Sequence, residues 1–435
     1  MQQIVWAEMD EEARVAALAR PAVTRNPDLD ERVADIIAAV RAGGDAALIE
    51  LTARFDGVDL ESLRVGSEEF AAAGAQIGAE ARAAIAVAID NVEKFHAAQL
   101  AGPVRVETVP GVLCERITRP IRAVGLYVPA GSAPLPSTVV MLAVPGRLAA
   151  GPTRVIGPPP RGDGRADPGV LVAAQMCGVD AVYKVGGAQA IAALAYGTAS
   201  IPKVDKIFGP GNSWVTAAKT AVAADPGGAA FDMPAGPSEV MVVADASANP
   251  RFVALDLLSQ AEHGADSQPV LVCTDARFGD AVAAEIEAAL VDLPRRAIIE
   301  RSLGNALRIL VDDVESGLGV ANRYAPEHLI LQVINARQYI DSIDNAGSIF
   351  VGEWAPESVG DYCSGTNHVL PTYGFARSYS GLSVGDFQKQ LTVQELSRAG
   401  LERLAPTVRT LATLEGLDAH AAAVAARLTE AGATR

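Results

Sequence analysis

Between residues 154 and 245, short apolar runs alternate with helical segments, and this alternation restricts the possible folds more than any other feature of the chain. The runs T-R-V-I-G, D-A-V-Y-K-V and V-D-K-I-F are each followed by a helical stretch, and E-V-M-V-V-A-D closes the series. Such repetition predicts a parallel sheet with right-handed crossovers. The alternation resumes after residue 263 in P-V-L-V-C-T, L-R-I-L-V, H-L-I-L-Q-V and S-I-F-V-G.

We therefore predict an α/β fold of two Rossmann-like units with parallel sheets, one inserted in the other. The main α/β domain is expected to comprise residues 26–128 and 239–382, and the inserted nucleotide-binding domain residues 129–238. An N-terminal helical arm (1–25) and a small helical C-terminal tail (383–435), expected to lack strands, complete the chain. A tail of this size buries little surface alone, so we expect it to pack on another domain or another subunit.

The net charge limits the classes of binding partner that we expect, and the cysteines indicate the cellular compartment. The formal net charge of −16 would repel nucleic acid and anionic membranes, so we expect neither as a partner. The most apolar stretch, residues 139–150, contains Pro145, Gly146 and Arg147 and is not a membrane span. The start of the chain lacks the pattern of a signal peptide. Cysteines so far apart, without a C-x-x-C pair, indicate reduced thiols in the cytoplasm: Cys114, Cys177, Cys273 and Cys363.

Residues 249–264, N-P-R-F-V-A-L-D-L-L-S-Q-A-E-H-G, carry the signals of a complete helix. Asn249 is a good N-cap, Pro250 suits the first helical position, and Gly264 is placed to stop the helix. Three apolar residues recur at helical spacing and are expected to face a core: Phe252, Leu255 and Leu258.

The same segment places three polar side chains on one stripe of the helix. Asp256, Gln260 and His263 stand at i, i+4 and i+7, so their side chains point in one direction. This stripe brings a carboxylate, an amide and an imidazole together where the helix ends. We interpret it as half of a metal or catalytic site. The other half is expected from later in the chain.

Three turns rich in small residues are candidates for a nucleotide site. The turns at 185–189 (V-G-G-A-Q) and 208–212 (F-G-P-G-N) place glycines where a strand ends and a helix begins, and a third lies at 127–138. Free N–H groups at such turns can hold a phosphate. There is no G-x-G-x-x-G and no phosphate-binding loop with Lys, and tight packing alone would also account for each turn. Three turns at one sheet edge favour a dinucleotide bound in a non-standard way.

Further polar residues occur in three later segments. Glu327 and His328 precede an apolar strand and suit a base and a proton relay, although a solvated turn is the plainer alternative. Asp361 and His368 belong to a long glycine-rich loop, and Glu415 and His420 lie near the last helix. The residues alone leave open whether a metal is bound and which histidines would bind it. The fifth histidine, in contrast, is expected at a surface or beside a helix C-terminus: His96.

At these segments the chain resembles the L-histidinol dehydrogenase family. The matching stretches are V-G-L-Y-V-P, K-V-G-G-A-Q-A-I-A-A-L-A-Y-G-T, V-D-K-I-F-G-P-G-N, D-M-P-A-G-P-S-E-V, Q-A-E-H, N-x-Y-A-P-E-H-L, G-D-Y-x-S-G-T-N-H-V-L-P-T and E-G-L-x-A-H. They follow the family's order from about residue 120 to 425. So many long matches in sequence are far more specific than one short motif.

The resemblance implies an enzyme that oxidises L-histidinol through L-histidinal to L-histidine with two NAD⁺ and bound Zn²⁺. It implies an intertwined homodimer whose C-terminal tail completes the neighbour's site. Glu327 would activate water and His328 would relay protons. The implied Zn²⁺ ligands, which hold the substrate, are Gln260, His263, Asp361 and His420. The further substrate contacts that the resemblance implies are Ser238, His328 and Glu415. The NAD contacts that it implies are Tyr127, Gln189 and Asn212.

These residues also allow other interpretations. Cys363, where a small residue is expected, could serve as a nucleophile in aldehyde oxidation, but a water route needs only Glu327 and His328. Another zinc- and NAD-dependent amino-alcohol dehydrogenase is the nearest alternative function. A metal-stabilised scaffold would have no use for this pair, and a nucleotide-binding regulator is not suggested by the acidic charge.

Overall fold

The computed structural model describes residues 1–20, 27–129, 133–151 and 153–430. The chain divides into two compact units. The first consists of Met1–Gln99 and Ile121–Phe387, and the second of Leu100–Pro120 and Gln388–Arg435. Part of the predicted turn at 127–138 and the ends of the predicted arm and tail lie outside the described residues.

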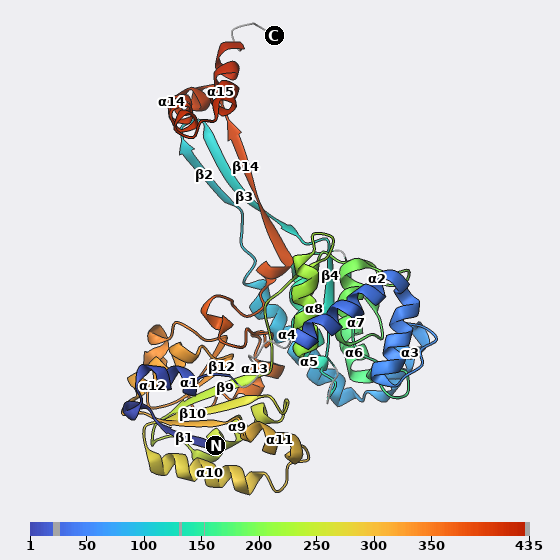
Figure 1. The fold of residues 1–435 in the computed structure, drawn as a ribbon, viewed down its shortest axis with the longest axis vertical. Helices are drawn as coiled ribbons and strands as arrows, with labels where there is room; N and C mark the ends of the chain where they lie inside the picture. The colour runs from blue at the N-terminus through green and yellow to red at the C-terminus, as the bar shows by residue number, and fades with distance from the viewer. Residues whose placement is uncertain (21–26, 130–132, 152, 431–435) are drawn as a thin grey trace. The chain divides into compact units, whose positions relative to one another are not determined.

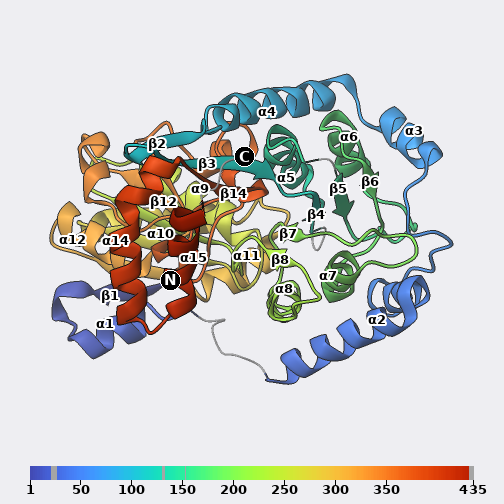
Figure 2. The ribbon, with the colours of Figure 1, turned by 90° about the horizontal axis from the view of Figure 1, so that it is seen from above.

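The first unit contains a five-stranded parallel sheet in the order β6-β5-β4-β7-β8. Helices α5 and α6, with α3 and α4, cover one face, and α2, α7 and α8 cover the other (Figure 2). The strands are β4 (Ala123–Tyr127), β5 (Thr153–Gly157), β6 (Ala181–Val182), β7 (Lys206–Phe208) and β8 (Ala230–Phe231). The helices are α2 (Pro27–Asp56), α3 (Ser67–Gln76), α4 (Ala79–Ala97), α5 (Pro136–Leu148), α6 (Pro168–Met176), α7 (Gly187–Tyr196) and α8 (Ser213–Ala224).

A six-stranded parallel sheet forms the rest of the first unit, in the order β1-β11-β10-β9-β12-β13. Helices α9, α10 and α11 cover one face, and α1 and α12 cover the other (Figure 1). The strands are β1 (Gln2–Val5), β9 (Glu239–Ala244), β10 (Gln268–Cys273), β11 (Leu307–Leu310), β12 (His328–Gln332) and β13 (Ser348–Val351). The helices are α1 (Glu11–Ala17), α9 (Pro250–Ala261), α10 (Ala276–Ala289), α11 (Arg296–Leu303), α12 (Val314–Tyr324) and α13 (Glu357–Tyr362).

The central strand β9 shows why the apolar runs of the sequence become parallel strands. All six of its residues are buried, Val240 and Val242 under α9 and α10, and Met241 and Val243 under α12. A strand covered by helices on both faces must be apolar at successive positions, which is the pattern of E-V-M-V-V-A. The predicted α/β class with parallel sheets is confirmed.

Helix α9 begins as predicted, but its buried face is rotated from the expected one. The Asn249 side chain accepts a hydrogen bond from the Arg251 N–H at 3.0 Å, which caps the helix. Leu255 is exposed, contrary to the prediction, because Val253, Ala254 and Leu257 form the contact with the sheet. The small residues in the helix allow more than one apolar stripe, and the spacing of the largest side chains indicated the wrong one.

His96, expected at a surface or beside a helix C-terminus, lies in the last turn of α4 and is fully buried. Its Nδ1 lies 2.8 Å from the carbonyl oxygen of Val92, one helical turn earlier. Asn367 approaches the other ring nitrogen at 3.3 Å. The position at the helix C-terminus is confirmed, but a surface position was wrong because a residue 271 positions away covers this histidine, which helical periodicity does not reveal.

The second unit is a three-stranded antiparallel sheet with two helices. The sheet has the order β14-β3-β2, and α14 and α15 follow it along the chain (Figure 1). The tail therefore contains a nine-residue strand, contrary to the expectation of helices alone. Its residues are mostly exposed and polar, so no apolar run marked them as a strand. The elements are β2 (Val104–Val109), β3 (Val112–Pro120), β14 (Gln388–Leu396), α14 (Arg398–Leu414) and α15 (Asp418–Glu430).

The division into domains stays a prediction, and several elements depart from it in detail. β1, assigned to the arm, is the edge strand beside β11. Helices α2 to α4 pack on the sheet that begins at β4, and β3 pairs with β14. Among the described residues no single helix is long and apolar enough to cross a membrane, whereas α3 and α4 reach that length and composition as a bent pair.

Candidate active site

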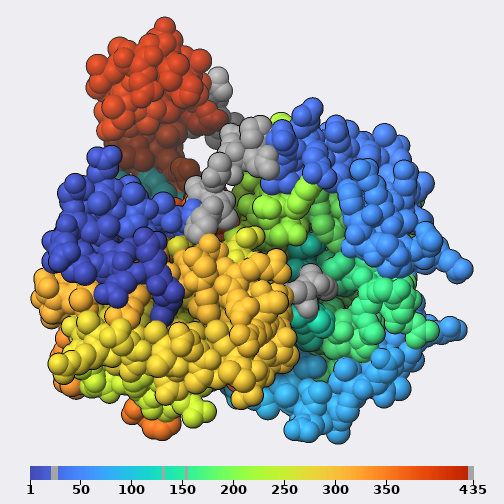
Figure 3. All heavy atoms as spheres, turned by 60° about the horizontal axis from the view of Figure 1, so that its bottom comes forward, coloured from blue at the N-terminus to red at the C-terminus, as the bar shows by residue number. Residues whose placement is uncertain are grey.

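A cleft of about 1760 Å³ lies within the first unit and is lined from both sheets. The carboxyl ends of the strands in the five-stranded sheet contribute Tyr127, Gln189 and Asn212. The amino ends of β9 and β12 contribute Ser238 and His328. Figure 3 shows the blue-to-green and yellow-to-orange surfaces meeting along a furrow. The volume exceeds the ~300–1,000 Å³ of a common small-molecule pocket and has room for two ligands.

The peptide groups of Glu239 hold both Glu327 and His328. The Glu239 N–H donates to Glu327 Oε2 at 2.8 Å, and its carbonyl accepts from His328 Nδ1 at 3.0 Å. Glu327 is 6 % and His328 3 % exposed, at the entrance of β12. Because Nδ1 donates to a carbonyl, Nε2 is the ring atom free to exchange a proton.

The ionisation of this pair is strongly shifted. Burial raises the pKa of Glu327 to about 8, while His328 and the Glu239 N–H oppose that shift. Burial alone would lower the pKa of His328, but Glu327, Glu357 and Asp361 outweigh it and raise it well above 6.5. A carboxyl group with a pKa near neutral suits a general base.

A cluster of possible metal ligands lies where α9 and α13 meet. Atoms of His263, Glu357 and Asp361 all lie within 4.8 Å of one another. His263 Nε2 is 3.9 Å from Asp361 Oδ2, and His328 Nε2 is 3.5 Å from Asp361 Oδ1. Glu357 also receives a hydrogen bond from Ser259 at 3.0 Å. Sequence reasoning missed Glu357, although its position four residues before Asp361 places both on one face of α13.

Gln260 provides the test of whether a metal fits here. Its side chain is fully buried, and neither amide atom has a hydrogen-bond partner among the residues that the structure describes. An unpaired buried amide is costly, so its oxygen is available as a ligand. The imidazole of His263 and the carboxylate of Asp361 are common ligands of Zn²⁺, whereas an amide oxygen is an unusual one. The residues present therefore fit a metal, and a bound cation would oppose the field that keeps His328 protonated.

The two carboxyl groups of α13 differ in their ionisation. Burial raises the pKa of Glu357 to about 8. For Asp361 burial acts in the same direction, but hydrogen bonding and charge from His328 outweigh it and lower the pKa to about 2. Asp361 is therefore the carboxylate ready to bind a cation, because a ligand must be deprotonated.

The residues expected to contact NAD line the same cleft at the turns that follow β4, β6 and β7. The Tyr127 hydroxyl accepts a hydrogen bond from the Gly187 N–H at 3.2 Å, and burial raises its pKa to about 12. Gln189 is buried in the first turn of α7. Asn212 caps α8 by accepting from the Val215 N–H at 3.2 Å. These positions are compatible with a nucleotide, and their role stays a prediction.

The turn before α8 has a conformation that only glycine adopts readily. Gly209 has φ +119°, and a Cβ there would lie 2.1 Å from the carbonyl oxygen of Tyr127. The Gly209 N–H donates to Asp232 at 2.7 Å, and Lys219 bonds to the Gly209 carbonyl and, at 2.8 Å, to Asp232. A buried ion pair therefore fixes this turn.

Ser238 and His368 also line the cleft, whereas the described lining of the cleft does not include Cys363. His368 Nδ1 lies 2.8 Å from the Asp361 carbonyl oxygen, and its Nε2 is 3.2 Å from the Thr138 hydroxyl. Both ring nitrogens thus have polar partners, and the ligand set implied by the resemblance does not include His368. Cys363 packs against the hydrophobic cluster around α5, which argues against a nucleophile.

Glu415 and His420 belong to the second unit, where both are exposed. Glu415 is the C-cap of α14, and His420 lies in the first turn of α15. Their roles as substrate and metal ligands stay predictions.

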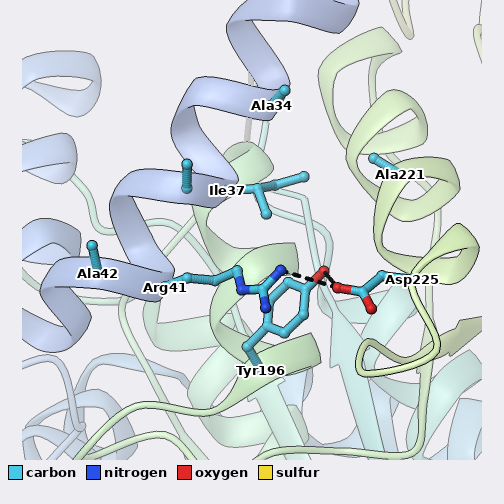
Figure 4. A pocket seen from close by; sticks show the side chains of 8 residues that line it. Ala34, Ile37, Arg41, Ala42, Tyr196, Ala221 and Asp225 are labelled. Atoms are coloured by element: carbon cyan, nitrogen blue, oxygen red, sulfur yellow. Dashed lines mark hydrogen bonds and ion pairs between the residues drawn. The ribbon is translucent and has the colours of Figure 1, made fainter.

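A shallower pocket between α2, α7 and α8 carries no comparable chemistry (Figure 4). Arg41 stacks over the Tyr196 ring and contacts Asp225 at 3.0 Å. The other side chains that line it are alanines and Ile37. These polar groups are paired with one another at the surface, so we assign no ligand to this pocket.

Comparison with known proteins identifies the relatives of this chain. The family model "Histidinol dehydrogenase" matches residues 19–428. Histidinol dehydrogenase of Vibrio parahaemolyticus is 53% identical over 430 residues, which are 98% of each chain. That of Xanthomonas euvesicatoria is 54% identical over 428 residues, 98% of this chain and 99% of the relative. The crystal structure of histidinol dehydrogenase from Elizabethkingia anophelis superposes with a TM-score of 0.95 at 44% identity, covering 100% of this chain and 99% of that one.

Proposed function

The chain belongs to the histidinol dehydrogenase family, and from that premise we propose that it oxidises L-histidinol through L-histidinal to L-histidine with two molecules of NAD⁺. The observation that supports this most directly is that the backbone N–H and C=O of one residue, Glu239, hold Glu327 and His328 beside the ligand cluster of α9 and α13. Per substrate the reaction consumes one water and two NAD⁺ and releases two NADH and three protons.

In the first oxidation the alcohol carbon loses a hydride and the hydroxyl loses a proton. His328 is fixed by its Nδ1–H bond to the Glu239 carbonyl, so Nε2 accepts the hydroxyl proton. Its burial excludes bulk water from this transfer.

In the second oxidation water must add to the aldehyde carbonyl before another hydride leaves. Glu327 is the group suited to take a proton from that water, since its pKa of about 8 matches this task. His328, having released the proton of the first oxidation through the cleft, then receives the proton of the resulting hydroxyl group as the acid forms. The same two residues, Glu327 and His328, thus serve the two oxidations.

The metal would be held by Gln260, His263 and Asp361, with His420 as the proposed fourth ligand. Zn²⁺ has no redox chemistry, so when bound it orients the substrate and polarises its oxygen. NAD⁺, held at the turns of Tyr127, Gln189 and Asn212, takes the hydrides. Ser238 and Glu415 are proposed to contact the substrate.

We further propose a homodimer in which the tail of one subunit completes the site of the other. The second unit has exposed apolar side chains, which are typical of a surface that another chain covers: Leu391, Val393, Leu396, Leu411, Leu414 and Leu417. Function in the cytoplasm and the lack of nucleic-acid or membrane partners stay predictions from cysteine content and charge.

The test is the amount of NADH formed per L-histidinol consumed, before and after chelation and after return of Zn²⁺. We expect two NADH per substrate, lost on chelation and restored by the metal. One NADH would mean that the aldehyde escapes and that the role of Glu327 is wrong. No NADH from zinc-loaded protein would reject histidinol as substrate and favour another amino alcohol.

A further inference from the structure

Glu239 has a second set of contacts besides those of its peptide groups. Its carboxylate, 3 % exposed, forms a two-point ion pair with Arg20, whose NH2 group lies 2.9 Å from Oε2. The same carboxylate accepts the Tyr373 N–H at 2.9 Å. Tyr373 lines the cleft and has a positive φ of 56°, which a side-chain contact of this kind can hold in place. One residue thus links the N-terminal segment to the catalytic pair.

Arg20 also reaches the chain segment that leads into the catalytic pair. Its guanidinium donates to the carbonyl of Tyr324 at 2.8 Å and to that of Ala325 at 3.4 Å. Ala325 has the left-handed conformation that ends α12, two residues before Glu327. The guanidinium stacks 3.9 Å above the ring of the buried Tyr324. Arg20 therefore fixes both segments whose relative position sets the geometry of Glu327 and His328.

A second arginine in the same N-terminal segment, Arg14, makes contacts of a similar kind but only with a nearby residue. Arg14 also stacks on an aromatic ring, 5.1 Å from that of Trp6, and donates to the Trp6 carbonyl at 3.2 Å. Both contacts are local, and among the described residues no hydrogen bond or ion pair joins its side chain to β9 or β12. Arg20 alone of the two contacts distant elements, β9 at Glu239 and α12 at Tyr324, which lie 219 and 304 positions away.

We propose that Arg20 is a positioning residue of the reaction: through Glu239 and the end of α12 it holds the base Glu327 and the proton relay His328 in their working geometry. The inference rests on the proposed function, because it assumes the roles given to those two residues. It makes the N-terminal segment part of the active-site support rather than an arm that only adds stability. A guanidinium is suited to the task, because its planar fork binds two carboxylate oxygens at once.

The experiment compares Arg20→Gln, Arg20→Lys and Arg14→Gln with the wild-type protein. We expect kcat about 10- to 100-fold lower for Arg20→Gln, because small displacements of catalytic groups have effects of this order. KM for L-histidinol and NAD⁺ and the zinc content are expected within about twofold of wild type, since Arg20 contacts none of the proposed ligands. Arg14→Gln is expected to keep kcat within about twofold.

The conservative variant guards against misfolding, because loss of one partner of a buried ion pair is destabilising. Arg20→Lys keeps Glu239 paired but lacks the fork, so we expect a folded protein with kcat between those of wild type and Arg20→Gln. The proposal is overturned if the kcat of Arg20→Lys matches that of Arg14→Gln. A loss explained by raised KM or by missing zinc overturns it as well.

The wild-type protein, measured alongside, reports on the proposed function separately. Its NADH yield from L-histidinol decides that function. The ratio of variant to wild-type kcat, on whichever amino alcohol the wild type oxidises, decides the role of Arg20.

Discussion

Two buried carboxyl groups near the cleft, Glu327 and Asp256, have raised pKa values for the same first reason, loss of hydration. Glu327 reaches about 8 and Asp256 about 7. They differ in where they lie. Glu327 lines the cleft, whereas Asp256 is a buried residue of α9 that the described lining of the cleft does not include. Changing Glu327 is therefore expected to affect the reaction, and changing Asp256 is expected to affect the stability of the fold.

Glu327→Gln should separate the two oxidations. The amide cannot take a proton from water, so we expect aldehyde oxidation to fall by ~10²–10⁴-fold while alcohol oxidation is much less affected. Rapid mixing under single-turnover conditions should then give one NADH per site instead of two. Cys363→Ala is the control and should keep both phases. Loss of the second phase in the cysteine variant would instead indicate a thioester route.

Asp256→Asn should change how stability depends on pH. A carboxyl whose pKa rises from 3.8 to about 7 on folding binds more protons when folded, so stability falls as pH increases from about 4 to 7. The asparagine variant should lose this dependence and be more stable at pH 8, by about 1–4 kcal/mol at ~1.4 kcal/mol per pKa unit. Urea unfolding of metal-free protein at pH 5 and pH 8 measures it. Asp292→Asn, at an exposed position, is the control, and equal pH slopes for the two variants would contradict the prediction.

At the scale of elements, alanine substitutions at two glycines are expected to have opposite effects on stability. One glycine lies in the turn between β7 and α8, and the other lies in α12. Gly209→Ala forces a side chain against the Tyr127 carbonyl at positive φ, so we expect a loss of about 1–3 kcal/mol and a higher KM for NAD⁺. Gly319→Ala, in the exposed face of α12 with open space around it, should stabilise by about 0.5–1 kcal/mol. Thermal unfolding and NAD⁺ titration report both, and an unchanged KM in Gly209→Ala would count against a nucleotide at this turn.

Elements with a strong local pattern were predictable from the sequence. The fully apolar runs gave the parallel strands, and Asn249 and Pro250 located the start of α9. Patterns that depend on distant partners were not predictable. Nothing local shows that exposed, polar β14 pairs with β3, or that small residues turn Leu255 outward.

The candidate site follows the same division. Gln260 and His263 could be paired from their spacing on one helix, but the remaining roles came from resemblance to a family. Glu357 could have been found from its spacing to Asp361. Arg20 could not, because its partner Glu239 lies 219 residues away and Arg20 itself stands in none of the matching stretches.

For the whole molecule, the proposed shared site predicts complementation between two inactive subunits. A mixed dimer of Glu327→Ala and His420→Ala subunits should contain one intact site, with Glu327 from one subunit and His420 from the other. Random mixing makes half of the dimers mixed, so about a quarter of wild-type activity is expected. No recovery in dimers proven to be mixed would mean that each subunit builds its own site.

The edge strand β1 has a consequence for how the protein is made. Gln2 pairs with Leu307, so β1 finds its neighbour only after about 300 more residues have been translated. At ~5–20 residues per second this takes about 15 to 60 s. During that interval Arg20, a few residues beyond the strand, lacks the carbonyl of Tyr324 as a partner. A nascent chain can thus complete its first parallel sheet early, yet it acquires the support of its catalytic pair only near the end of synthesis.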